Sequence, residues 1–191
     1  MDHVMRSSST PEPTTTSTSM DLSVLNAGFP GISPEWGASL AQAASVSLEV
    51  RGHAPPKECQ VDGSIEAIHN LLWPAVTDQI RRTWGDLDEA VEHGAYGMAA
   101  LLVAAHTELE VVERSRKGTG FDYWLGQKGE NSDLFQRTAR MEVSGIGKGG
   151  DSVVATREKE KIEQTSMSDG LLPAYIVIVE FGTPRARVVV K

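Results

Sequence analysis

Apolar and polar positions in the first half of the chain follow two different periods. In residues 33–50 the apolar positions recur every three or four residues, which predicts a helix. Ser33 suits the N-cap of that helix and Pro34 its first turn. In residues 58–73 apolar and polar positions alternate around an Asp-Gly break, which is typical of a strand or hairpin. A short helix that begins at a proline is expected over residues 74–85.

The second half of the chain alternates between helical and strand periods more clearly. The expected elements are a long helix (86–106), three strands (108–115, 120–126 and 139–146), a charged helix (151–167), a strand (173–182) and a short final strand (185–191). Residues 173–182 form the most continuous β-branched run, as expected for a strand that is buried on both faces. The pattern as a whole predicts an α/β fold.

The length of the chain, 191 residues, suits one domain and a tail, and its 40 % apolar content is sufficient for a real core. Residues 1–20 are mostly Ser, Thr and Pro without hydrophobic periodicity, so we expect a disordered tail. Residues 21–85 are expected to form an N-terminal extension of helix and hairpin. Residues 86–191 are expected to form the α/β core.

The net charge of −8 is unevenly distributed. Residues 21–110 carry 4 Lys or Arg against 13 Asp or Glu, whereas residues 111–191 carry 13 against 11. A basic region can attract phosphate while the rest of the chain repels it. The acidic half argues against tight nonspecific binding of nucleic acid by this chain alone.

Cysteine and histidine content limits the metal and redox chemistry. Cys59 is the only cysteine, so an internal disulfide and a cysteine-based zinc cluster are both excluded, and a reducing cytoplasm is the expected compartment. The five histidines, at positions 3, 53, 69, 93 and 106, are scattered, and none forms the close pair typical of zinc sites. Because no apolar run approaches about 20 residues, no membrane partner is expected.

Two acidic residues interrupt the apolar strand segments of the second half. Asp122 lies in "GFDYWLG" and Glu142 in "ARMEVSGI". A carboxylate within a buried strand is unfavourable unless it is compensated. These two therefore either bind a metal ion or accept hydrogen bonds within the domain. Since side chains two residues apart share a strand face, Glu142 is expected on the same face as Arg140 and Ser144.

With these two acids, the order helix, strand, strand, strand, helix, strand over residues 86–181 resembles the PD-(D/E)XK nuclease superfamily. The resemblance implies a restriction-endonuclease-like αβββαβ core in which Asp122 and Glu142 hold Mg²⁺ or Mn²⁺, assisted by Glu92 of the first helix. It also implies a metal-dependent phosphodiesterase that cleaves nucleic acid, with DNA favoured over RNA.

The chain departs from the superfamily at the position two residues after the motif glutamate. Family members usually have a lysine there, whereas this chain has Ser144, which cannot supply a positive charge. The candidates that could replace this charge are Lys117, Arg140, Lys148 and Lys161. Of these, Lys117 or Lys148 is expected to lie near the phosphate. Gln164 is expected to face the site, as a polar residue of this helix often does in the superfamily.

The sequence leaves two other functions open. One is a non-catalytic relative that binds nucleic acid or a protein partner, as a homodimer or as a subunit of a bacterial defence or mobile-element system. The other is a structural or immunity-type protein without a nucleic-acid role. The segment "RSRKGTG" likewise fits either a loop that grips phosphate or a solvated turn between strands.

Overall fold

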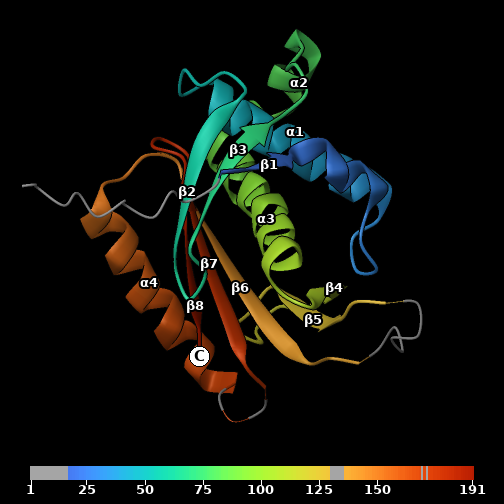
Figure 1. Cartoon of the computed structure of the whole chain (residues 1–191), viewed down its shortest axis with the longest axis vertical. Coiled ribbons are helices and arrows are strands. Elements are labelled where there is room, and N and C mark those ends of the chain that lie inside the picture. Colours follow the sequence, from blue (N-terminus) through green and yellow to red (C-terminus); the bar gives the residue numbers. More distant parts are fainter. Residues whose placement is uncertain (1–16, 130–135, 169, 171) are drawn as a thin grey trace, which may run out of the picture.

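The computed structural model describes residues 17–129, 136–168, 170 and 172–191 (Figure 1). The strands of this part are β1 (Thr18–Asp21), β2 (Lys57–Gly63), β3 (Ala67–Leu72), β4 (Leu109–Arg114), β5 (Tyr123–Gln127), β6 (Ala139–Ile146), β7 (Ala174–Glu180) and β8 (Arg185–Val190). The helices are α1 (Pro34–Glu49), α2 (Asp78–Thr83), α3 (Leu87–His106) and α4 (Asp151–Thr165), with 3₁₀ segments η1 (Leu22–Ala27) and η2 (Ser166–Ser168).

The strands form one mixed sheet of eight strands within the described residues, in the order β1-β3-β2-β8-β7-β6-β5-β4. The α/β class and the element order α3-β4-β5-β6-α4-β7 are both confirmed. Strands β4, β5 and β6 are antiparallel neighbours, and α4 connects β6 to the parallel strand β7. Six of the seven residues of β7 are buried, so the strand is covered on both faces, as its β-branched run predicts.

The N-terminal extension continues the same sheet. The predicted hairpin is present as the antiparallel pair β2–β3, and β2 pairs in parallel with β8 of the core. The sheet therefore contains strands from both sides of the boundary predicted at residue 86. The predicted disordered tail falls mostly on residues 1–16, outside the described part, but Thr18–Asp21 pairs with β3, so the sheet begins before the predicted boundary at residue 21.

Helices cover both faces of the sheet (Figure 1). Helix α3 packs against one face and α1 packs against α3, and both helices share the main hydrophobic core with Met141 and Val143 of β6. Helix α4 covers the other face, where Val154 packs with Ile146 and Ile178. Alternate residues of β6 therefore face either the main core or α4.

Side-chain caps mark the first residues of helices α1 and α2. Ser33 Oγ accepts a hydrogen bond from Trp36 N at the start of α1, as the sequence predicts. The short helix α2 begins later than its predicted start at Pro74, because Thr77 Oγ1 accepts a hydrogen bond from Ile80 N and caps the helix there. Among the described helices, none combines the length and the apolar character needed to cross a membrane.

Candidate metal centre

Asp122 and Glu142, here called the acid pair, lie opposite each other on neighbouring strands. Tyr123 pairs with Met141 in the antiparallel register of β5 and β6, so Asp122, one residue before β5, comes opposite Glu142. Asp122 N donates a hydrogen bond to Met141 O at 2.9 Å, which continues this pairing. The sequence prediction that the two carboxylates converge is consistent with this register.

The carboxylate of Asp122 is anchored by the backbone of β6. Its Oδ2 atom accepts a hydrogen bond from Val143 N at 2.8 Å, and Tyr96 Oη lies 3.4 Å from its Oδ1 atom. Burial raises the pKa of Asp122, and the Val143 N–H and the charge of Lys161 offset part of that rise. The side chain is thus held in one orientation, toward Glu142.

Glu142 is almost completely buried, with 2 % of its surface exposed. Its Oε1 atom accepts hydrogen bonds from Lys161 Nζ at 2.5 Å and from Gln164 Nε2 at 3.0 Å. Its Oε2 atom is also buried but has no hydrogen-bond partner among the described residues. Burial and the neighbouring Asp122 raise the pKa of Glu142 to about 7, although the Lys161 ammonium lowers it in part.

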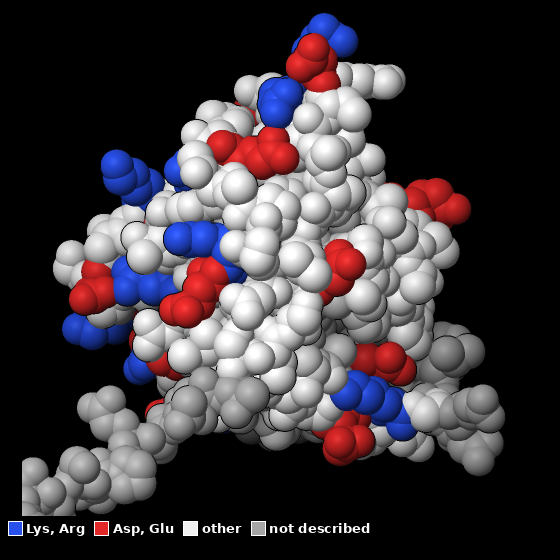
Figure 2. All heavy atoms as spheres, turned by 45° about the horizontal axis from the view of Figure 1, so that its top comes forward, with Lys and Arg blue, Asp and Glu red and all other residues white. Residues whose placement is uncertain are grey.

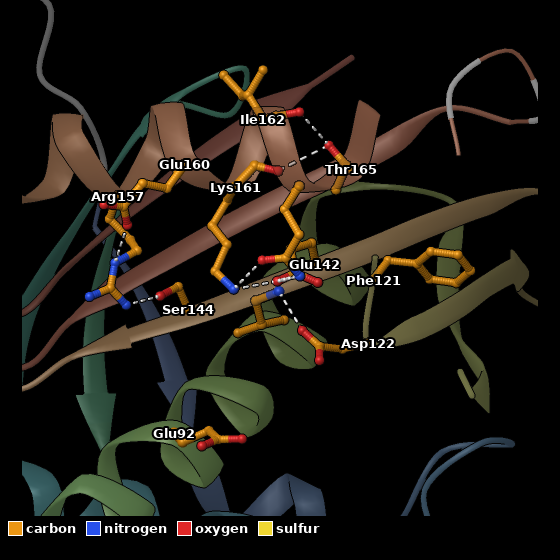
Figure 3. Close-up of polar contacts among 12 residues, drawn as sticks. Glu92, Phe121, Asp122, Glu142, Ser144, Arg157, Glu160, Lys161, Ile162 and Thr165 are labelled. Carbon is orange, nitrogen blue, oxygen red and sulfur yellow. Dashed lines mark hydrogen bonds and ion pairs between the residues drawn. The ribbon is translucent and has the colours of Figure 1, made fainter. Parts of the chain in front are cut away.

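Helix α4 supplies the cations of the site, as Figure 3 shows. Lys161 points at Glu142, and one turn earlier Arg157 Nη1 donates a hydrogen bond to Ser144 Oγ at 2.9 Å. The two cations are four residues apart on the helix, and their partners are two residues apart on β6, so both contacts form on one face of the strand. A positive charge therefore lies beside Ser144.

The other three predicted cations lie elsewhere. The guanidinium of Arg140 is buried and donates hydrogen bonds to Leu172 O, Thr165 O and Ser168 Oγ. It therefore stabilises the segment that follows α4. Lys117 and Lys148 are exposed and line two different hollows beside the acid pair. Of the four candidates, Lys161 is the one whose ammonium contacts a member of the acid pair.

Glu92 lies on α3, apart from the acid pair (Figure 3). Tyr96 connects the two, because its hydroxyl donates to Glu92 Oε1 at 2.8 Å and also approaches Asp122. Within the described residues no group of three or more His, Cys, Asp or Glu side chains is arranged to share an ion. The sequence had not singled out Tyr96, although its spacing of four residues from Glu92 places both on the same helix face.

Two hollows meet at the acid pair. The larger has a volume of about 670 Å³ and extends along β6 past Ser144 to Lys148 and Arg157. The smaller has a volume of about 430 Å³ and lies under the loop from Arg114 to Phe121. The residues that line both hollows are Glu92, Asp122, Glu142 and Gln164. The arrangement leaves room for an extended ligand on either side of the two carboxylates.

The chemistry of the acid pair fits a divalent cation. Mg²⁺ and Mn²⁺ prefer carboxylate oxygens. The buried Oε2 atom of Glu142 lacks a partner, and a cation between the carboxylates would remove the repulsion that raises the pKa of Glu142. With one positive charge from Lys161 against two carboxylates, the site also retains a net negative charge when both acids are ionised.

The surface charge does not by itself indicate nucleic acid. Among the described residues on the face in Figure 2, basic and acidic side chains lie next to one another and form no continuous basic patch. No protein-family model matches the chain, and no match is found among curated proteins or solved structures.

Proposed function

We propose that the chain is a metal-dependent phosphodiesterase that cleaves nucleic acid, DNA in preference to RNA, and is a divergent relative of the PD-(D/E)XK superfamily. The observation that carries the proposal is the contact of Lys161 with Glu142, opposite Asp122. It brings two carboxylates and one ammonium together, and these are the charges that the superfamily motif combines.

In this proposal Asp122 and Glu142 would hold Mg²⁺ or Mn²⁺, which when bound would stabilise charge on a phosphodiester and lower the pKa of a bound water. Lys161 stabilises the negative charge that develops during attack, in place of the motif lysine. Gln164 orients Lys161, since Lys161 Nζ donates to its Oε1 atom at 3.0 Å. Glu92 assists through Tyr96, whose pKa is raised by burial and by Asp122, so that its hydroxyl remains a donor.

The hollows on either side of the acid pair suit successive phosphates of one strand. Arg157 and Lys148 line the larger hollow, and Lys117 lines the smaller. Cations on both sides of the carboxylates would neutralise neighbouring phosphates and fix the scissile one at the acid pair. Because these cations are few and separated by acids, binding is expected to be weak and to decrease with salt.

The test is a cleavage assay with the purified full chain. Duplex, single-stranded and branched DNA and RNA are incubated with Mg²⁺ or Mn²⁺, beside Asp122→Ala and Glu142→Ala. We expect cleavage of DNA that requires the metal and is lost in both variants. Cleavage that both substitutions leave intact would overturn the assigned site. Binding of DNA without any cleavage would favour the non-catalytic relative instead.

A further inference from the structure

The fold brings together two histidines that are far apart in the sequence. His69 lies in β3, and His106 is the last residue of α3. Their Nε2 atoms are 2.7 Å apart, and their ring centroids are 5.0 Å apart. The sequence pattern indicated no close pair of histidines, and this prediction is wrong, because the fold brings the last residue of α3 next to β3.

The geometry favours neutral imidazoles with one nitrogen each directed at the other. Two protonated rings at this separation would repel each other, and burial together with His106 lowers the pKa of His69. Thr18 Oγ1 lies 2.9 Å from Nδ1 of His69. A hydrogen bond from Nδ1–H to this oxygen leaves the Nε2 lone pair of His69 facing His106, as in histidines that bind metals.

A cavity beside the rings gives access to them. It has a volume of about 430 Å³ and is lined by residues of β1 and by Val24, His69, Leu101, Ala105 and His106. His69 is buried, with 3 % of its surface exposed, whereas His106 is exposed and free to adjust. A tetrahedral ion about 2.0–2.1 Å from each nitrogen would need them roughly 3.3 Å apart, so a small movement of the His106 ring would be sufficient.

We propose that His69 and His106 form a two-histidine site for a borderline divalent transition-metal ion, with Zn²⁺ as the reference ion and water as its remaining ligands. Imidazole nitrogens suit Zn²⁺, Ni²⁺ and Cu²⁺ and do not suit Mg²⁺. The ion fastens the edge formed by β1 and β3 to the C-terminal end of α3. The site is separate from the acid pair, and it does not depend on the proposed nuclease activity.

The experiment is a Zn²⁺ titration of the metal-stripped full chain against a chromophoric chelator, with Mg²⁺ in excess to occupy oxygen sites. We expect one equivalent of Zn²⁺ to bind. Since losing even an outer partner of a ligand commonly costs 10–100-fold in affinity, His106→Ala should weaken binding at least about tenfold. His93→Ala is the matched control, because His93 lies on the same helix but outside the cavity, and it should bind Zn²⁺ as the wild type does.

A second readout is the melting temperature. Zn²⁺ should raise it for the wild-type chain and not for His106→Ala or for His106→Gln, which preserves side-chain bulk. An Asp122→Asn variant should retain Zn²⁺ binding, since it changes only the acid pair. The proposal is overturned if the wild type binds no Zn²⁺, if the His106 variants bind it unchanged, or if Asp122→Asn abolishes binding.

Discussion

Replacing Glu142 by glutamine tests the electrostatics of the acid pair without a change of size. The side chain is buried, its Oε2 atom lacks a partner among the described residues, and it faces a second carboxylate. Glutamine keeps an oxygen for the hydrogen bond from Lys161 but removes the buried charge. We therefore expect Glu142→Gln to stabilise the metal-free protein at alkaline pH while abolishing cleavage.

The magnitude follows from the pKa of Glu142. A rise from the ordinary value of 4.5 to about 7 corresponds to about 3 kcal/mol, at about 1.4 kcal/mol for each pH unit. The folded state favours the protonated carboxyl, so this contribution is present in full below about pH 4.5 and is lost as the pH rises through about 7. The wild type should lose about 2–3 kcal/mol across this window relative to Glu142→Gln, which has no such group.

The assay is urea unfolding in EDTA at a series of pH values from about 4.5 to 8.5. The matched control is Glu163→Gln, which makes the same change at an exposed position of α4 and should give a curve parallel to that of the wild type. Addition of Mg²⁺ or Mn²⁺ at pH 8 should restore stability to the wild type and leave Glu142→Gln unchanged. Parallel pH curves for the wild type and Glu142→Gln would refute the reasoning.

Four other substitutions test separate parts of the structure. Lys161→Met removes the ammonium at Glu142, so cleavage should fall about 100-fold or more in the gel assay, and an unchanged rate would exclude Lys161 from the chemistry. Gly94→Ala would place a methyl group 2.8 Å from Ala44 Cα, so urea unfolding should report a loss of about 1–3 kcal/mol. Gly150→Ala, which meets no atom within 4 Å, should cost less than about 1 kcal/mol, and equal losses would contradict this packing. Arg140→Met leaves buried carbonyls without their donor and should cost about 3 kcal/mol in the same assay, while retaining cleavage below its melting temperature.

The acid pair could be predicted from the sequence because the alternation of side chains along a strand is a local property. A side-chain period of two and an antiparallel connection place the two acids on neighbouring strands, and the register of β5 and β6 brings Asp122 opposite Glu142. The order of the core elements follows from the same patterns, and the start of α1 follows from its cap Ser33. The strand Thr18–Asp21 was not predicted, because its four residues are mostly polar and show no strand pattern of their own. They form a strand by pairing with β3.

The choice among the candidate cations could not be read from the sequence. Each of them carried the same charge, and their distances from the acid pair depend on how α4 lies over β6. The contacts of Val154 with Ile146 and Ile178 contribute to that placement, and the helix and strand periods do not specify them. The approach of His69 to His106 likewise depends on packing between α3 and the sheet.

Binding of Mn²⁺ to the metal-free chain tests the central claim most directly. The loss of the free-ion electron paramagnetic resonance signal measures binding whether or not the right nucleic acid has been found. We expect one Mn²⁺ per chain at pH 8, with binding lost in Asp122→Asn and Glu142→Gln and retained in Glu163→Gln. Equal binding by the wild type and both acid-pair variants, or no binding by the wild type, would contradict a metal site at Asp122 and Glu142.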